Sequence, residues 1–340
     1  MNTQSLLTDT IGIVAIARNE GERLKDCLQS LHAAAPQSPI IYVDSGSTDG
    51  SVEYAHQIGV GVIELDTSIP FTAARARNSG AKKLLETYPE IQFIQFLDGD
   101  CQLQPQWLSS AIEFLEKDKS FAVVCGRRRE LYPEASLYNA LIDDEWNTPV
   151  GEALACGGDA LYRRDQFVAV GGFDDTIIAG EEPELCYRLR QSDWKIQRID
   201  EEMTLHDADL HHFPQWWRRA KRYGHAAFEA AWRYGREPER YYVRDVCRIL
   251  LWALAVPLLI LLLIIISPRW GWLSLAVYPL QIFRLYLGAT KQGIPSQLAF
   301  VKSWTMIACK FAELLGGLRF LGNRLLGKKN TLIEYKTSKS

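Results

Sequence analysis

Two aspartates one residue apart, Asp98 and Asp100, follow directly on the apolar run FIQFL at residues 93–97. Carboxylates on a short loop are ligands that Mg²⁺ accepts, and a bound cation is usually the largest charge in its site. An Asp-Gly pair is also common in turns exposed to water. The pattern therefore indicates either a divalent-cation site or a solvated turn at the end of a buried strand.

Polar residues also follow two earlier predicted strands. Arg-Asn-Glu at 18–20 comes after the strand at 11–17, and a run of Asp, Ser, Gly and Thr begins at the end of the strand at 40–44. Helical patterns alternate with strands as far as residue 130 or so, which predicts an α/β fold with a mostly parallel sheet. Ligands on such sheets bind beyond the carboxyl ends of the strands. Three polar strand ends at one edge therefore predict a ligand site.

Composition narrows the function. The net charge of −3 does not favour a nucleic-acid partner. The seven cysteines include no CxxC pair, which indicates reduced thiols, and no Cys/His spacing favours zinc. GxGxxG after the first strand and GxxxxGK[ST] are both absent, so the phosphates of a bound nucleotide must be neutralised in another way, and a metal ion held by Asp98 and Asp100 would do so.

Six motifs in order resemble the family 2 glycosyltransferases, which have the GT-A fold. They are VAIARNEGERL, IIYVDSGSTDGS, FTAARARNSGAKKL, FLDGDCQLQPQWL, GGDALYRRDQFVAVGGFDD and AGEEPELCYRLR, and the resemblance extends from residue 11 to about 225. It implies that Asp44 contacts the base of a nucleoside-diphosphate sugar and that the backbone around Ala15 and Arg18 completes that pocket. It also implies that Asp98 and Asp100 form a DXD element that holds Mg²⁺ or Mn²⁺ against the diphosphate.

By the same resemblance, Arg75 and Asn78 border the nucleotide, although Arg75 and Arg77 could instead be solvated helix charges. The family usually has Gly-Glu-Asp where this chain has Gly-Glu-Glu at 180–182. Glu182 therefore falls at the position of the general base, and Glu181 is the alternative. A carboxylate can deprotonate an acceptor hydroxyl if it lies within hydrogen-bond reach and is ionised.

Residues further along the chain supply more candidates. His206 matches a position where some relatives have a third metal ligand, and a structural role is the alternative. Arg219 and Arg222 could stabilise the leaving diphosphate or attract an anionic membrane surface. Gln215 begins a segment similar to the QxxRW element of processive relatives, but Arg219 stands where tryptophan is expected, which argues against processive polymerisation.

The C-terminal part predicts membrane attachment. Residues 249–266 contain no charge and are about long enough to cross a bilayer. Residues 272–290 form a second apolar segment, which either crosses the membrane with Arg284 snorkelling or lies partly in the interface. The predicted organisation is a catalytic domain at 1–235, a linker at 236–248, a transmembrane hairpin at 249–290, and a basic amphipathic helix and tail at 291–340. We predict no signal peptide.

These observations predict an inverting, metal-dependent glycosyltransferase on the cytoplasmic face of the inner (plasma) membrane. Its expected partners are a nucleoside-diphosphate sugar, a lipid-linked or glycan acceptor and membrane lipids. Two alternatives remain at this point. One is transfer of a single sugar to polyprenyl phosphate, which needs no general base, and the other is a noncatalytic membrane scaffold that retains the fold.

Overall fold

The computed structural model describes residues 10–328 and residue 331. The described chain forms two compact units, one made of residues 10–132 and Ile142–Asp209, the other of Pro133–Leu141 and the residues from Leu210 onward. The first unit is thus shorter than the predicted catalytic domain of residues 1–235. The difference arises because the helix at Phe213–Tyr234 packs with the C-terminal helices.

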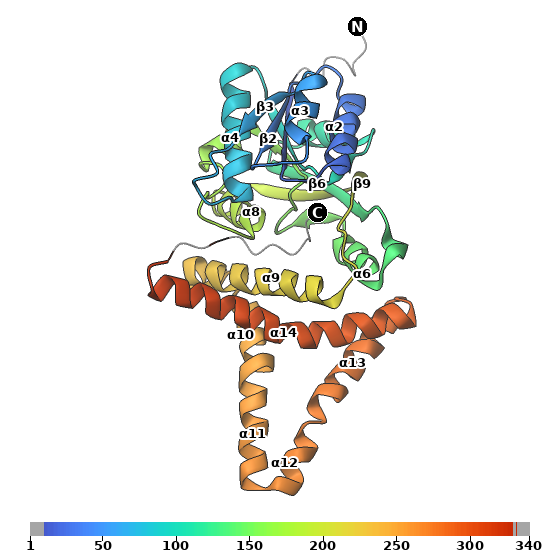
Figure 1. Ribbon diagram of the computed structural model, residues 1–340, viewed down its shortest axis with the longest axis vertical. Helices are drawn as coiled ribbons and strands as arrows, with labels where there is room; N and C mark the ends of the chain where they lie inside the picture. Colours follow the sequence, from blue (N-terminus) through green and yellow to red (C-terminus); the bar gives the residue numbers. More distant parts are fainter. Residues whose placement is uncertain (1–9, 329–330, 332–340) are drawn as a thin grey trace. The chain divides into compact units, whose positions relative to one another are not determined.

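The first unit is built on a nine-stranded sheet in the order β3-β2-β1-β4-β8-β6-β9-β5, with β7 paired to β9 (Figure 1). The first four strands of that order are parallel, whereas β8 runs antiparallel to β4 and β6. The predicted α/β class is confirmed, with a mixed sheet. The strands are β1 (Ile11–Ala17), β2 (Ile40–Asp44), β3 (Gly61–Glu64), β4 (Phe93–Asp98), β5 (Cys101–Leu103), β6 (Phe121–Glu130), β7 (Gly151–Ala153), β8 (Leu161–Arg163) and β9 (Lys195–His206).

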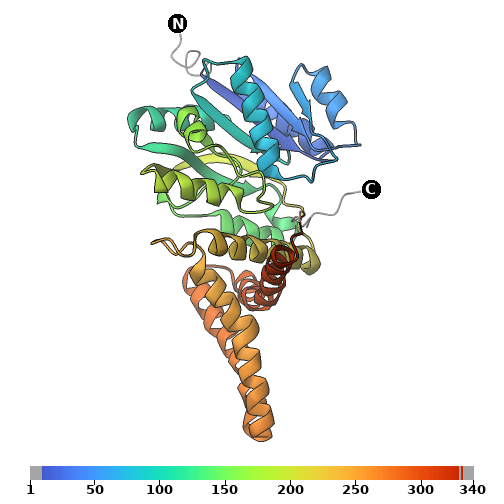
Figure 2. The same ribbon diagram turned by 90° about the vertical axis from the view of Figure 1, so that its left-hand side faces the viewer.

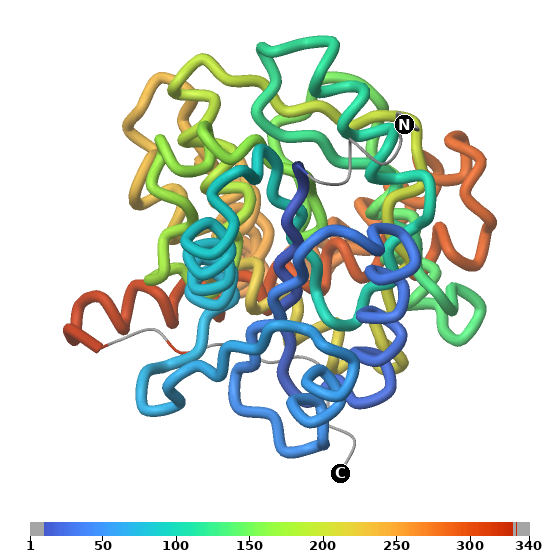
Figure 3. The backbone as a smooth tube through the Cα atoms, turned by 90° about the horizontal axis from the view of Figure 1, so that it is seen from above, coloured from blue at the N-terminus to red at the C-terminus, as the bar shows by residue number. Residues whose placement is uncertain are grey.

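Helices cover both faces of this sheet, and the alternation of strand and helix can be followed along the blue and cyan tube in Figure 3. All seven residues of β1 are buried. A Cβ at Gly80 would overlap Val14, so α4 lies close against the strands, as Figure 2 shows. The helices of this unit are α2 (Glu22–Ala34), α3 (Ser51–Gln57), α4 (Ala73–Thr87), α5 (Trp107–Lys117), α7 (Arg164–Ala169) and α8 (Glu181–Gln191), and α6 (Leu137–Trp146) is divided between the two units.

Strand register brings the predicted acidic residues to one edge. Ala17 of β1 pairs with Asp44 of β2, and Ile16 pairs with Asp98 of β4. Because the three strands are parallel and adjacent, their carboxyl ends meet at the same edge of the sheet. The predicted convergence of the strand ends is therefore confirmed.

The second unit is helical. Its long helices α9 and α14 cross closely, because a Cβ at Gly224 would overlap the backbone of Glu313 and one at Gly316 would overlap that of Lys221. The helices are α9 (Phe213–Tyr234), α10 (Val243–Leu250), a π-helical turn (Leu251–Ala255), α11 (Val256–Ile266), α12 (Pro268–Ser274), α13 (Val277–Lys291) and α14 (Ser296–Leu325).

One helix in the described part of the chain, Val243–Ile266, is long and apolar enough to cross a membrane. Its side chains are largely exposed; Leu258 is 55% and Ile265 70% accessible. The second predicted apolar segment, 272–290, is divided between α12 and α13. The 15 residues of α13 rise roughly 22 Å, less than the hydrocarbon thickness of a bilayer.

The remaining boundaries of the C-terminal part follow from these helices. The predicted linker at 236–248 already contains the start of α10, which continues into the apolar helix. The predicted amphipathic helix corresponds to α14. Residues 329–330 and 332–340 of its predicted tail, Lys329 among them, lie outside the described residues.

Candidate functional site

The loops that follow β1 and β2 are joined by hydrogen bonds. The Asn19 side-chain oxygen accepts a bond from the Thr48 backbone amide at 2.8 Å, and the Asn19 amide donates to Ser47 Oγ at 2.9 Å. The Gly21 amide donates to Asp49 Oδ2 at 2.8 Å. Asn19 has a φ of 55°, a conformation that asparagine tolerates better than most residues. These hydrogen bonds connect the loop after β1 to the loop after β2 at the same edge of the sheet.

Asp44 is held tightly at this edge. It is 2% exposed, and its Oδ1 atom accepts a hydrogen bond from the Tyr42 hydroxyl at 2.5 Å. Its Oδ2 atom accepts from the amides of Gly46 and Ser47, both at 2.8 Å. Burial and this neighbouring carboxylate raise the pKa of the Tyr42 hydroxyl, which stays a donor. The role of Asp44 in base binding stays a prediction.

The two predicted residues of β1 and its loop differ in exposure. Ala15 lies inside β1, fully buried and in register with Tyr42 and Leu97. Arg18 is exposed in the loop that follows the strand.

Arg75 and Asn78 of α4 hold neighbouring loops. Arg75 donates to the backbone oxygens of Asp66 and Ile69 at 2.8 and 3.0 Å. Asn78 donates to the Phe173 carbonyl at 2.7 Å and accepts from the Phe173 amide at 3.0 Å. Both side chains thus fix the loops that border the carboxylate edge, and their contact with a nucleotide stays a prediction.

Arg77 is a residue of the site to which the sequence pattern assigned no role. Its side chain is 2% exposed, so the alternative of a solvated helix charge is wrong for Arg77. Its Nη2 atom lies 2.7 Å from Asp98 Oδ1 and 3.1 Å from Glu182 Oε1, and Nη1 lies 2.9 Å from Glu181 Oε1. The signal was present in the sequence, since Arg77 shares a helical face with two apolar residues of α4, Ala81 and Leu84.

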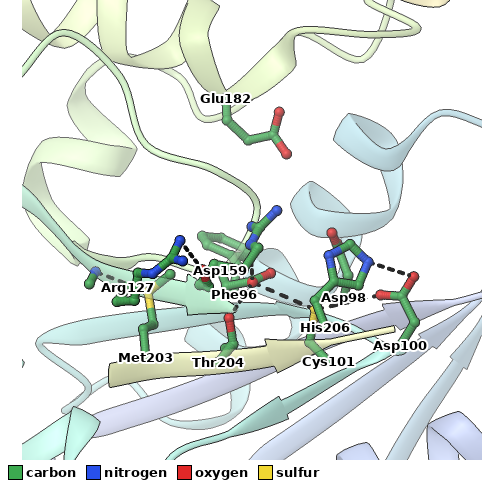
Figure 4. A network of polar contacts seen from close by, with 12 residues as sticks. Phe96, Asp98, Asp100, Cys101, Arg127, Asp159, Glu182, Met203, Thr204 and His206 are labelled. Carbon is green, nitrogen blue, oxygen red and sulfur yellow. Dashed lines mark hydrogen bonds and ion pairs between the residues drawn. The ribbon is translucent and has the colours of Figure 1, made fainter. Parts of the chain in front are cut away.

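Glu181 and Glu182 begin α8 after Gly180, whose φ of 82° favours glycine. The helix dipole at this end favours carboxylates. Glu181 is 3% exposed and Glu182 15%, so Glu182 is the more accessible of the two. Burial and the charge of Glu181 raise the pKa of Glu182 to about 7, against the opposing effect of Arg77. Figure 4 shows Glu182 reaching from its helix toward the strands that carry the aspartates.

The rest of α8 matches its sequence pattern. Arg188 forms an ion pair with Glu184, one turn away in this helix, at 2.8 Å. Leu185 and Leu189 are fully buried, as their spacing predicts.

Asp100 and His206 come together with a residue that was not predicted, Cys101. Cys101 of β5 pairs in register with His206 of β9. His206 Nε2 lies 3.1 Å from Asp100 Oδ2, and the Cys101 thiol lies 3.5 Å from Asp100 Oδ1 (Figure 4). Apart from this ion-pair contact of Nε2, neither ring nitrogen of His206 has a hydrogen-bond partner among the described residues, although the side chain is only 8% exposed. A buried imidazole next to a carboxylate is a donor set that fits a divalent cation.

Trp146 covers His206. The two rings are stacked, with centroids 4.7 Å apart and planes at 15°. The guanidinium of Arg128 lies over the indole of Trp146, 5.3 Å from the centroid of that ring. The same guanidinium forms an ion pair with the buried Asp159 at 2.7 Å. The imidazole is therefore held in one orientation by its neighbours.

The two predicted arginines of the second unit are on α9. Arg219 lies over the ring of Trp216 at 5.2 Å, and Arg222 is in the next turn of the helix. The side chain of Gln215 caps this helix by accepting hydrogen bonds from the amides of His211 and His212 at 2.8 and 3.0 Å. This capping explains Gln215 without a processive element. The roles of Arg219 and Arg222 stay predictions.

All seven cysteines lie within the described residues and are free thiols, as their spacing predicts.

The family model that matches this chain and the two similar proteins named here are all described as glycosyltransferases. Residues 12–166 match the model of the family described as glycosyl transferase family 2. The chain is 24% identical over 216 residues to the glycosyltransferase AglE of Haloferax volcanii, covering 59% of this chain and 69% of that protein. It is 29% identical over 182 residues to the O-antigen chain rhamnosyltransferase WbaN of Salmonella anatum, covering 50% of this chain and 56% of that one.

Solved structures share the fold. The mannosyltransferase PcManGT of Pyrobaculum calidifontis, solved in complex with GDP-Man and Mn²⁺, superposes with a TM-score of 0.59 at 16% identity, over 91% of this chain and 87% of that one. Residues 1–349 of TarS from S. aureus superpose with a TM-score of 0.50 at 12% identity, over 94% of this chain and 92% of that one.

Proposed function

Because this chain belongs to glycosyltransferase family 2 and has the GT-A fold, we propose that it is an inverting, metal-dependent enzyme. It moves a sugar from a nucleoside-diphosphate sugar to a hydroxyl group of a lipid-linked or polysaccharide acceptor. The similarity to an O-antigen chain rhamnosyltransferase supports a role in the synthesis of cell-envelope glycans.

One observation carries this proposal: Arg77 joins Asp98 of the DXD element to Glu182 of α8, at 2.7 and 3.1 Å. The aspartate ends a strand at the ligand edge, and the glutamate begins a helix that lies far from it in the sequence. Transfer of a sugar to a hydroxyl needs a residue that helps to bind the donor and a base that contacts the acceptor, both within one small volume. The shared guanidinium brings the two carboxylates within that range.

Glu182 is the proposed general base. Its pKa of about 7 leaves a large part of the side chain ionised at neutral pH and makes the carboxylate basic enough to take a hydroxyl proton. The acceptor oxygen forms a bond to the anomeric carbon while the bond from that carbon to the diphosphate oxygen breaks. The proton goes to Glu182 and the electron pair leaves with the nucleoside diphosphate. A single displacement of this kind inverts the anomeric configuration.

Asp100 and His206, with Asp98, are the proposed ligands of Mg²⁺ or Mn²⁺. A divalent cation held there would neutralise the charge that develops on the departing diphosphate. Arg75, Asn78 and Arg219 are among the proposed contacts of the donor, together with Arg222, Ala15, Arg18 and Asp44.

The proposed location is the inner (plasma) membrane, with the catalytic unit on its cytoplasmic face. Support comes from the apolar helix Val243–Ile266 and from the basic residues of α14, which include Lys302 and Arg319. An enzyme attached to the membrane would meet a lipid-linked acceptor at a high local concentration.

The test is donor turnover by the full-length protein purified in detergent. UDP-, GDP- and dTDP-sugars are incubated with the protein and Mn²⁺ or Mg²⁺, and release of the nucleoside diphosphate is measured together with the anomeric configuration of any product. We expect one donor class to be used, only when the cation is present. If no donor is turned over and none raises the melting temperature, the proposed function is wrong.

A further inference from the structure

Three carboxylates in the site share the guanidinium of Arg77. Arg77 contacts Asp98, Glu181 and Glu182 at 2.7, 2.9 and 3.1 Å. Asp98 and Glu182 are contacted by the same nitrogen, Nη2. A change in how strongly one of these two carboxylates attracts Nη2 must therefore change the position of Arg77 relative to the other.

The surroundings of Arg77 limit where it can go. The guanidinium is buried and lies 5.5 Å from the ring of Phe173. Gly158 also adjoins the guanidinium: a Cβ there would overlap Nη2 and would lie 2.8 Å from Asp98 Oδ2 and 3.0 Å from Glu182 Oε1. This enclosure keeps the guanidinium close to its three carboxylate partners.

The ion pairs of Arg77 join three carboxylates to one guanidinium, and Asp98, with 30% of its side chain exposed, is the most exposed of the three. A divalent cation that takes Asp98 as a ligand competes with Arg77 for the same carboxylate. Because charges in a buried site are screened weakly, this competition changes how strongly Arg77 binds Glu182.

We propose that Arg77 is a positioning residue that couples cation binding at Asp98 to the placement of Glu182. When the charge of Asp98 is shared with a cation, Nη2 binds Glu182 more strongly and holds the glutamate in one position. The inference rests on the proposed function, because it assumes that Asp98 receives a cation and that Glu182 is the base. Thermodynamic coupling is reciprocal, so the state of Glu182 must in turn alter the affinity for the cation.

The coupling predicts an unusual result for the removal of Arg77. A residue that only supports the fold would weaken cation binding when it is replaced. A residue that competes for Asp98 strengthens cation binding when it is replaced, while turnover falls because Glu182 loses its partner. Affinity and turnover therefore change in opposite directions.

The experiment measures Mn²⁺ binding by titration calorimetry, and by the loss of the free Mn²⁺ signal in electron paramagnetic resonance, on the full chain in detergent. Arg77→Met is expected to bind Mn²⁺ at least fivefold more tightly than the unmodified protein and to lose at least a hundredfold in kcat. Arg77→Lys, which keeps the charge but cannot bridge three carboxylates, serves if Arg77→Met does not fold. The lysine variant is expected to change in the same two directions by less. Lys82→Met removes a charge from the exposed side of the same helix and is expected to change neither quantity.

A double-mutant cycle isolates the coupling. Glu182→Gln is expected to weaken Mn²⁺ binding several-fold in the unmodified protein, because Arg77 then stays with Asp98, and to weaken it less in the Arg77→Met or Arg77→Lys background. If the effects of the two substitutions on Mn²⁺ affinity are additive, or if replacing Arg77 weakens binding, the coupling is refuted even though the enzyme transfers sugar. If the unmodified protein binds no Mn²⁺, the cation part of the proposed function is refuted and the coupling with it.

Discussion

The indole of Trp146 lies flat against the imidazole of His206, with ring centroids 4.7 Å apart and planes at 15°. The two residues end different elements, since Trp146 is the last residue of α6 and His206 the last of β9. The stacking directs Nε2 of the imidazole toward Asp100, 3.1 Å away. Partners that orient a histidine ligand typically change metal affinity about 10–100-fold when they are removed.

This stacking leads to the first prediction. Trp146→Leu removes the flat surface and is expected to weaken Mn²⁺ binding about tenfold, whereas Trp146→Phe keeps a ring and is expected to stay close to the unmodified protein. Calorimetric titration measures the affinity, and Asp100→Ala, which removes a proposed ligand, marks the complete loss of binding. Trp232→Leu changes an exposed tryptophan of α9 and is the control. Equal affinities for Trp146→Leu and the unmodified protein would show that the stacking does not orient His206.

The second prediction concerns the general base. Glu182→Gln keeps the size of the side chain and removes its charge, so kcat is expected to fall about 10²–10⁴-fold with little change in donor KM. Product formation from the donor found in the screen gives both constants. The control is Glu53→Gln, which removes a carboxylate from α3 and is expected to leave turnover unchanged. Full activity of Glu182→Gln would favour a phosphate acceptor such as polyprenyl phosphate, because a phosphate needs no base.

A third prediction follows from the pKa of Glu182. Its value of about 7 lies above the ordinary value of 4.5, so the base is protonated and inactive in mildly acidic solution. The rate is expected to rise about tenfold per pH unit below pH 7 and to level off above it. A plateau that extends unchanged down to pH 5 would rule out Glu182 as the titrating base.

The same pKa affects stability in the opposite sense. Between pH 4.5 and about 7 the folded chain keeps a proton that the unfolded chain releases. Stability therefore falls as the pH rises through this window. At pH 8, the free energy of unfolding of Glu182→Gln is expected to exceed that of the unmodified protein by an amount on the order of 1–3 kcal/mol. Its melting temperature is expected to be higher for the same reason. Calorimetric or fluorescence melting curves at pH 5 and 8 give the comparison, and at pH 5 we expect a smaller difference between the two proteins.

The fourth prediction tests the enclosure of Arg77. In Gly158→Ala the added Cβ would overlap Arg77 and crowd Asp98 and Glu182. We expect a loss of about 1–3 kcal/mol in the free energy of unfolding and a drop in turnover of at least tenfold. Gly322→Ala, at a helix position with open space around it, is the matched control and is expected to be neutral or slightly stabilising. A fully active Gly158→Ala would mean that the cluster tolerates displacement.

Much of the first unit could be predicted because its signals are local. The strand at 11–17 and the strand at 40–44 have the same bounds in the structure as in the sequence pattern. Leu24, Leu28 and Leu31 are buried on one side of α2, as their helical spacing predicts. Periodicity of this kind depends only on neighbours along the chain, so it can be recognised without knowledge of the tertiary fold.

The second apolar segment shows where such signals were insufficient. Residues 272–290 have the composition of a membrane span, but the helix is interrupted between Ser274, where α12 ends, and Val277, where α13 begins. Composition measures how apolar a stretch is, whereas the length of an unbroken helix depends on its backbone conformation. One described helix, Val243–Ile266, meets both conditions.

By itself, the sequence determined that an acidic edge exists and which strands form it, because each aspartate follows a strand whose pattern is evident. It could not show which charges meet there. Arg77, Asp98 and Glu182 come from three distant segments, and their ion pairs exist only once α4, β4 and α8 are packed together. The position of Cys101 beside His206 likewise depends on the pairing of β5 with β9. Spacing along the chain records local periodicity, but the distance between two side chains far apart in sequence is set by the packing of the elements that carry them.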